Sequence, residues 1–198
     1  MKPKIIIDSI PMHTEYSDVQ LLEIFHKGSR AEREKVFGII VKRYSRSLYS
    51  YLRRILVSHD DTDDILQETF IKAWNNLDTI KDGGALKNWL YRTASNAAIS
   101  LLRERANAMT VPLDDYDVIQ ESSNAEEMAQ MDRMSRLTSE AIHSLPKIQQ
   151  MVFTMKHFQG LKYSQISEIL GTSEGSLKAS YHIAVEKIRK YVEQKNDI

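Results

Sequence analysis

Polar and basic side chains near the C-terminus are spaced as in proteins that contact a DNA groove. The run Tyr163–Leu170 has helical periodicity, Gly171-Thr172-Ser173 predicts a tight turn, and a second helix is expected over about Glu174–Tyr191. Two helices joined in this way form a helix-turn-helix, whose second helix enters the major groove and offers hydrogen-bonding groups to base edges. The side chains that could contact DNA here are Ser176, Lys178, Ser180, His182 and Lys187. His182 could equally be an exposed polar residue without a ligand.

A second cluster of functional residues lies about a hundred residues upstream. Acidic and amide side chains occur there at helical spacing, together with one aromatic residue: Asp63, Asp64, Gln67, Glu68 and Phe70. One interpretation is the solvated face of an amphipathic helix. The other is a docking face, on which the carboxylates meet basic residues of a partner protein and set its orientation and association rate.

The segment after this cluster combines the three kinds of group that hold a single nucleic-acid strand. Aromatic faces stack on bases, amides bind base edges, and cations bind phosphates. These groups are Lys87, Trp89, Arg92, Asn96, Arg103 and Arg105. The alternative is that Trp89 and Tyr91 are core aromatics and that Arg103 to Arg105 form a solvated helix end.

No residue pattern indicates catalysis or a cofactor. The chain has no cysteine, which excludes disulfides and thiolate sites. Its six histidines lack metal-ligand spacing, and the Asp60–Asp64 run lacks the alternation of a calcium loop. Gly83-Gly84 is not followed by the Gly-Lys-Ser/Thr of a phosphate loop. We therefore expect no enzyme activity, no cofactor or metal, and no small-molecule substrate.

Helices are needed to position these clusters, and the spacing of the apolar residues predicts such helices. Four helices are expected in the first half of the 198 residues, and strand-like alternation occurs nowhere, which predicts an all-α fold of two small domains. The expected helices are Ser17–Gly28, Ala31–Val57, Thr62–Leu77 and Ala85–Arg105. In the second half, Pro146 is expected to start a helix and Gly160 to stop it, while Ser164 and Ser173 are expected to cap the two helices of the helix-turn-helix.

Charge and composition divide the chain into four segments. Residues 84–108 and 176–195 each carry a net charge of +3, whereas residues 109–136 carry −5, although the whole chain is formally neutral. Basic segments separated by an acidic one are typical of a protein with two nucleic-acid sites. We expect an N-terminal extension (1–16), a four-helix domain (17–108), an acidic linker that can end in a helix (109–136) and a helix-turn-helix domain (137–198). No apolar run is long enough to cross a membrane, and no secretory signal is recognisable, so a cytoplasmic location is expected.

Taken together, the motifs resemble those of the extracytoplasmic-function sigma factors of the sigma-70 family. The series Asp64-x-x-Gln67-Glu68-x-Phe70, Ala73-Trp74, Trp89-Leu90-x-x-x-Ala94-x-Asn96 and Leu101-Leu102-Arg103 resembles region 2 of that family. The series Leu145-Pro146, Gly160-Leu161-x-Tyr163-x-x-Ile166 and Ile169-Leu170-Gly171 resembles region 4. The match covers about residues 25–193.

The resemblance implies a transcription initiation factor. Its first domain would bind the β′ subunit of core RNA polymerase and melt the −10 element, with the loop from Asp78 to Ala85 shaping a base pocket. Its helix-turn-helix would bind the −35 element, and its linker would run through the polymerase toward the RNA exit path. Further implied partners are the β subunit, promoter DNA and an anti-sigma factor, often membrane-anchored.

Two departures from the family pattern bear on DNA recognition. Ser100 stands where relatives often have aspartate, and Leu177-Lys178-Ala179-Ser180 stands where many have Val-Lys-Ser-Arg. The missing arginines predict fewer phosphate or guanine contacts, and therefore a weaker or different −35 preference. Two other functions fit parts of the sequence: a dimeric helix-turn-helix regulator that needs no polymerase, and a helical adaptor that binds no DNA. The first leaves the upstream motifs unexplained, and the basic segments argue against the second.

Overall fold

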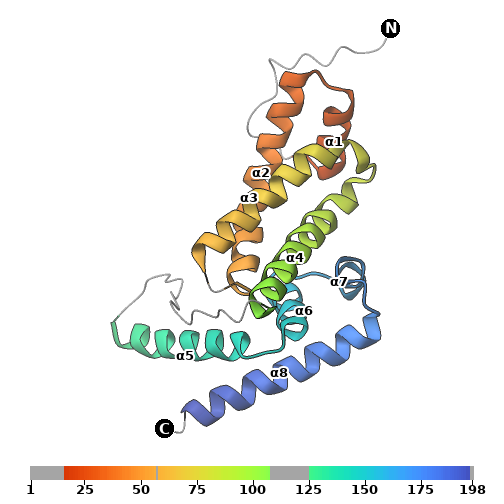
Figure 1. Cartoon of the computed structure of the whole chain (residues 1–198). Coiled ribbons are helices and arrows are strands. Elements are labelled where there is room, and N and C mark those ends of the chain that lie inside the picture. Colours follow the sequence, from red (N-terminus) through yellow and green to blue (C-terminus); the bar gives the residue numbers. More distant parts are fainter. Residues whose placement is uncertain (1–15, 57, 108–124, 197–198) are drawn as a thin grey trace.

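The computed structural model describes residues 16–56, 58–107 and 125–196. Within these ranges every regular element is a helix and no strand occurs, so the all-α prediction is confirmed. The expected N-terminal extension and the first part of the acidic linker lie outside the described residues. Figure 1 shows α1 to α3 in the upper part of the molecule, α5 and α8 along the bottom, and α4, α6 and α7 between them.

The first half of the chain forms four α-helices and one short 3-10 turn: α1 (Asp18–Lys27), α2 (Arg30–Arg53), α3 (His59–Asn76), η2 (Leu77–Thr79) and α4 (Gly83–Asn107). Serine side chains set the starts of these helices. Ser17 Oγ accepts from the Gln20 amide while Gln20 Oε1 accepts from the Ser17 amide, which forms a capping box. Ser58 Oγ accepts from the Asp61 amide, so α3 begins before Thr62, where the sequence placed its start.

Helix α2 ends four residues earlier than the sequence predicted. The amides of Ile55 and Leu56 both donate to the carbonyl of Leu52, which tightens the last turn and points the chain inward. Ile55 and Leu56 are fully or almost fully buried. The apolar pattern therefore continues past the helix because these two residues enter the core from a turn.

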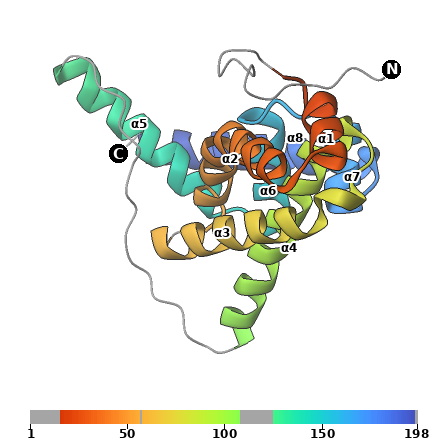
Figure 2. The same cartoon turned by 90° about the horizontal axis from the view of Figure 1, so that it is seen from above.

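The second half contains α5 (Ala125–His143), α6 (Lys147–His157), α7 (Tyr163–Leu170) and α8 (Glu174–Asn196). Residues 125–136, which we expected in the linker, are helical. Helix α6 starts directly after Pro146 and is followed by Gly160, whose φ of 62° lies in the left-handed region that glycine adopts readily. Helices α5 and α8 lie side by side, with α6 packed against α8 (Figure 1), and Figure 2 shows α5 extending away from the four-helix part.

One of the two predicted caps of the helix-turn-helix is wrong. Helix α7 begins at Tyr163, so Ser164 lies inside it, and the amide of Lys162 donates to Gln165 Oε1 at the helix start. Glutamine at this position reaches back to the helix start and takes over part of the capping that we assigned to serine. The other cap is confirmed, because Ser173 Oγ accepts from the Ser176 amide at the start of α8. Gly171, with φ 65°, ends α7 as a left-handed residue.

The buried residues form one large core that extends through both halves of the molecule. Apolar residues of α1 to α4 and of α6 to α8 belong to the same cluster: examples are Phe25, Leu48, Leu90, Met155, Ile166 and Leu177. A smaller cluster holds α5, α6 and α8 together through Ala141, Ile142, Leu145, Phe153, Ala184 and Ile188. The helix-turn-helix is therefore packed directly on the four-helix part.

Candidate polymerase and nucleic-acid interfaces

The outward face of α3 presents the acidic and amide groups that the sequence singled out. Asp63, Asp64, Gln67 and Glu68 are all exposed. Glu68 forms an ion pair with Lys72 one turn later, at 2.5 Å between Oε1 and Nζ. Both partners of this pair are about half exposed, so it contributes little to stability and can exchange for contacts with another protein.

Phe70 does not lie on this face. Its side chain is 9% exposed and packs edge-to-face on Phe37 of α2, with ring centroids 6.4 Å apart. The sequence-based assignment of Phe70 to a docking surface does not match this burial, because a core ring cannot meet a partner directly. What Phe70 does is fix α3 on α2, so that the opposite face of α3 points to solvent.

The sequence reading missed one residue on the exposed side of α3. Ile71 is 55% exposed and follows Gln67 and Glu68 by one helical turn. A signal existed in the sequence, because Ile71 falls outside the Leu66, Phe70 and Ala73 stripe that fills the core. A single exposed isoleucine is common on protein surfaces, but this one lies among the charged groups of the same face, where it could supply apolar contact to a partner.

Three of the predicted strand-binding residues share one exposed face of α4. Arg92, Asn96 and Arg103 are exposed, and helical geometry places them within about 40° of one another around the axis. The row is roughly 16 Å long at 1.5 Å per residue. A guanidinium, an amide and a second guanidinium along such a row could bind phosphates and one base edge of a few nucleotides.

The other predicted strand-binding residues of α4 have contacts within the chain, as does Arg92, whose guanidinium donates to the Glu168 carbonyl of α7. Lys87 and Trp89 are half-buried; the Lys87 ammonium lies 5.9 Å from the centre of the Tyr91 ring, and Trp89 packs against the core. Arg105 forms a two-pronged ion pair with Asp61 of α3, with 2.6 Å between Nη2 and Oδ1. Part of the basic charge predicted for DNA is therefore held by this chain's own acids and rings.

Two residues of α4 have contacts that the sequence did not indicate. The amide nitrogen of Asn88, a buried residue, donates to Glu168 Oε2 of α7 at 2.6 Å. The Tyr91 hydroxyl donates to Gln159 Oε1 at 2.8 Å, and burial raises the pKa of that hydroxyl. Tyr91 is fully buried, as the core-aromatic alternative expected, and Asn88 is buried on a different side of α4 from Leu86 and Leu90. They give α4 a second buried side.

The recognition helix α8 keeps an open outward face. Ser176, Lys178, His182 and Lys187 are exposed, whereas Ser180 is half-buried and turned toward the core side of the helix. Ser176 Oγ lies 3.0 Å from Ser173 Oγ, and the Lys187 ammonium donates to Gln149 of α6 at 3.1 Å. Lys178 and His182, one turn apart, are therefore the candidates with the fewest internal contacts.

Tyr163 at the start of α7 organises the basic groups beside this face. Two ammonium groups lie over its ring, Lys156 Nζ at 4.9 Å from the centroid and Lys178 Nζ at 5.7 Å. Its ring packs edge-on against Tyr181 of α8, which orients it. Cations are attracted to the face of an aromatic ring, so Tyr163 brings one lysine of α6 and one of α8 together.

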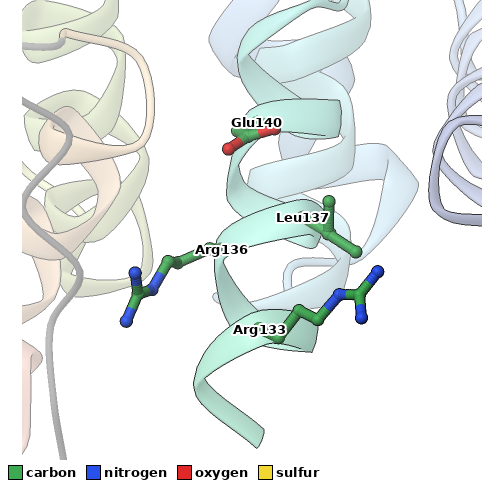
Figure 3. Close-up of a pocket in the computed structure, with 4 residues that line it drawn as sticks. All are labelled: Arg133, Arg136, Leu137 and Glu140. Atoms are coloured by element: carbon green, nitrogen blue, oxygen red, sulfur yellow. The ribbon is translucent and has the colours of Figure 1, made fainter. Parts of the chain in front are cut away.

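A shallow pocket on α5 is lined by Arg133, Arg136, Leu137 and Glu140, but Figure 3 shows the two arginines pointing to opposite sides of the helix. Among the described residues, no group of three potential ligands could hold a metal ion. The described helices also include none that combines the length and the apolar character needed to cross a bilayer.

Comparison with known proteins identifies the family. The model for sigma-70 region 2 matches residues 40–108, and the model for sigma-70 region 4 matches residues 135–188. The ECF RNA polymerase sigma-E factor of Escherichia coli K12 is 30% identical over 193 residues, covering 92% of this chain and 97% of that protein. The chain belongs to the extracytoplasmic-function sigma-factor family.

Other relatives of this sigma factor agree. The sigma-E factor of Haemophilus influenzae is 27% identical over 191 residues, covering 92% of this chain and 98% of that protein. The fold is similar to that of CnrH, solved with the cytosolic domain of CnrY, with a TM-score of 0.65 at 21% identity over 90% of this chain and 99% of CnrH. It is also similar to RpoE of Bartonella quintana, solved with the anti-sigma factor NepR, with a TM-score of 0.68 at 20% identity over 80% and 98%.

The family settles the general function. This sigma factor is a transcription initiation factor that directs RNA polymerase to specific promoters. The resemblance seen in the sequence is thereby confirmed, and the regulator and adaptor alternatives are not.

Proposed function

We propose that this sigma factor divides promoter recognition between two domains, residues 17–108 and 137–198, joined by the acidic linker. In the first domain, the outward face of α3 binds core polymerase through Asp63, Asp64, Gln67 and Glu68, with Ile71 at its apolar centre. Helix α4 of the same domain opens and holds the −10 element. In the second domain, α8 binds the −35 element. The polymerase supplies the chemistry of RNA synthesis.

A single face of α4 carries the −10 assignment. Arg92, Asn96 and Arg103 project from one side of a helix whose other sides are buried, so the row is rigid; Asn96 and Arg103 are exposed, and the exposed Arg92 also donates to the Glu168 carbonyl of α7. Holding a melted strand requires such a row, because the strand must be kept in place without its complement. Trp89 at the edge of the row supplies an aromatic surface, while Lys87 and Arg105 lie on another side of α4 and could add positive charge only around the helix.

The −35 assignment has weaker support in this chain. The outward face of α8 offers a serine, a lysine and a histidine, Ser176, Lys178 and His182, with Ser180 and Lys187 at its margins, and no arginine in its first turns. Bidentate guanine contacts, which arginine makes best, are therefore missing. We infer a shallow −35 preference, with Lys178 as the main phosphate or guanine contact.

An anti-sigma factor is the expected regulator in the cytoplasm. The support is that RpoE, whose fold is shared, was solved bound to an anti-sigma factor, and CnrH to the cytosolic domain of CnrY. The test is to purify this chain from its own cells and to identify the proteins that come with it. An anti-sigma factor among them is expected to abolish promoter-specific transcription.

Run-off transcription is the first test of the proposal. Core polymerase from the organism that encodes the chain is incubated with fragmented genomic DNA, with and without the purified sigma factor. Discrete transcripts that depend on the chain are expected, and their start sites define both promoter elements. If a folded chain gives no new transcript, the proposal fails.

Variants of the sigma factor, tested on a promoter found in this way, distinguish the roles of the two domains. Permanganate reactivity of the −10 thymines in duplex DNA should fall in each of three variants: Arg92→Ala, Asn96→Ala and Arg103→Ala. The decrease should be smaller in DNA that is already melted. Lys178→Ala and His182→Ala should weaken protection of the −35 element only. Lys42→Ala, which removes an exposed cation of α2, is the matched control and should change neither.

A further inference from the structure

One strip of the recognition helix α8 is apolar and open to solvent. Ile183 is 44% exposed, and Ala179, one turn earlier, is exposed as well. At about 100° per residue, Ile183 lies about 120° around the helix axis from the buried Leu177, so its side chain points away from the core. Figure 1 shows α5, α6 and α7 on one side of α8 and no described helix on the other.

The strip lies inside the face that is proposed to read the −35 element. Ser176, Ala179 and Ile183 follow one another at spacings of three and four residues, within about 60° around the axis. Lys178 and His182 border this strip on one side. From Ser176 to Ile183 the strip is about 10 Å long at 1.5 Å per residue, which corresponds to about three base pairs at 3.4 Å each. The base-reading residues of homeodomain recognition helices likewise span about seven positions.

Apolar side chains on such a face have one matching group in the major groove. The C5-methyl group of thymine is the apolar group that base pairs present there, and G·C pairs lack it. Guanine is read best by arginine, but the one arginine of α8, Arg189, is paired with Glu186 at 2.9 Å and with Glu193 at 3.4 Å. An isoleucine against a G·C pair would leave the polar groups of that pair without hydrogen-bond partners, which costs affinity.

The charges around the strip favour DNA over a second protein as its partner. Lys178 lies beside the strip, and Lys187 and Lys190 continue the same side of α8 in the next two turns. All three lysines are exposed, and residues 176–195 carry a net charge of +3. Cations around an apolar centre suit a DNA groove, because the methyl groups lie on its floor and the phosphates lie along its rims.

We propose that Ile183, with Ala179 beside it, reads thymine methyl groups of the −35 element, which therefore contains A·T pairs where it faces this strip. The inference rests on the −35 role of α8 proposed above and names the bases that α8 selects. Lys178 supplies affinity, and Ile183 supplies the preference for one base over another. A methyl group buried against the isoleucine should improve affinity about 3- to 4-fold, as expected for the burial of one apolar carbon.

The test removes single methyl groups from the DNA. Deoxyuridine pairs with adenine as thymidine does and lacks only the C5-methyl group. On a promoter mapped by run-off transcription, each −35 thymine of either strand is replaced in turn, in a duplex that ends upstream of the −10 element. Fluorescence anisotropy measures the affinity of the wild-type holoenzyme, which should fall about 3- to 4-fold at one or two neighbouring positions and stay unchanged elsewhere.

A double-mutant cycle then joins the methyl group to its reader. Ile183→Ala should weaken binding to the thymine duplex by a similar factor and should no longer distinguish thymine from deoxyuridine at that position. Ile148→Ala shortens an equally exposed isoleucine of α6 (47%) and is the matched control, which should keep the full thymine preference. Ile183→Arg should turn the preference at the same pair toward guanine, because arginine binds the O6 and N7 atoms of guanine.

Several results would overturn the inference. A mapped −35 element without thymine on either strand would do so at once, as would wild-type binding that no deoxyuridine changes. A deoxyuridine effect that persists in Ile183→Ala or in Ile183→Arg would assign the methyl group to another residue. If Ile183→Ala instead lowers affinity for core polymerase, measured in parallel, and leaves DNA binding unchanged, the strip binds a protein.

Failure of the proposed function gives a different result. If α8 does not read the −35 element, exchanging the whole element for an unrelated sequence should leave the affinity of the wild-type holoenzyme unchanged. Lys178→Ala should then have no effect on either duplex. If the exchange lowers affinity and no single deoxyuridine does, the −35 role of α8 stands and only the thymine readout by Ile183 is wrong.

Discussion

Asp61 in the first turn of α3 binds both terminal nitrogens of the Arg105 guanidinium at the end of α4. The Asp61 side chain is only 12% exposed, and Arg105 is 44% exposed. A two-pronged pair of this kind fixes direction as well as distance. It therefore links the start of the helix proposed to bind polymerase to the end of the helix proposed to bind the −10 strand.

Asp61→Asn should weaken this link and release a cation. The free energy of unfolding should fall by about 1 kcal/mol, because a partly buried ion pair is lost while the amide keeps the size of the side chain. Urea unfolding measures this change. If the released Arg105 then contacts a phosphate, the salt dependence of holoenzyme binding to DNA should steepen by nearly one unit of slope. Asp60→Asn, at an exposed acid of the same turn, is the control and should do neither.

Ile71→Ala should weaken the binding of core polymerase without destabilising the chain. The side chain is 55% exposed, so shortening it removes apolar area that only a partner can bury. The dissociation constant should rise about 5-fold, equivalent to about 1 kcal/mol. Val19→Ala, at an exposed residue of α1 (48%), should leave it unchanged. Equal affinities for the two variants would remove Ile71 from the docking face.

Tyr163 should be needed for −35 binding through its ring and not through its hydroxyl. Tyr163→Phe keeps the platform under Lys178 and should change holoenzyme affinity for a −35 duplex less than 2-fold, whereas Tyr163→Ala should lower it roughly 3- to 10-fold. Fluorescence anisotropy measures both. A purely structural role is distinguished by a double-mutant cycle: once Tyr163 is alanine, Lys178→Ala should cost less than it does alone.

Much of the fold could be predicted because apolar periodicity and caps are local signals. The buried stripe of α2, with Ile40, Tyr44, Leu48 and Leu52 at a spacing of four, gives that helix directly, and Ser173 gives the start of α8. The wrong assignment of a cap to Ser164 also has a local cause, because the cap that forms there uses the Lys162 backbone and the Gln165 side chain. Serine is a good cap, but its presence does not decide which residue begins a helix.

The contacts between the halves could not be predicted from the sequence. Asn88 and Tyr91 are polar residues that donate hydrogen bonds to Glu168 and Gln159, about 70 to 80 positions away in the chain. Neither residue breaks the amphipathic pattern of α4, so periodicity cannot show that α4 is covered on two sides. Phe70 was assigned to the docking surface although it lies on the apolar stripe of α3, because it belongs to a motif and the motif was interpreted as a surface.

His143 at the end of α5 should make the stability of the chain depend on pH. Its side chain is half-buried, and its Nδ1 lies 3.2 Å from Gln150 Nε2, which also donates to the Arg54 carbonyl at the junction with α2. Burial, together with the nearby cations Lys147 and Arg53, lowers the pKa of His143 to about 4. The folded chain therefore keeps this imidazole neutral at pH values where the unfolded chain, with a pKa near 6.5, takes up a proton.

The sign of the effect follows from proton uptake. Between about pH 6.5 and 4 the unfolded state binds more protons than the folded state, so stability falls as the pH falls through this range. From pH 7.5 to 5 the loss should be on the order of 2 kcal/mol, measured by urea unfolding. His143→Gln has no such group and should lack this part of the pH dependence, while the contribution of the carboxylates is common to both proteins. If the two proteins lose stability in parallel, His143 is not held neutral by the fold.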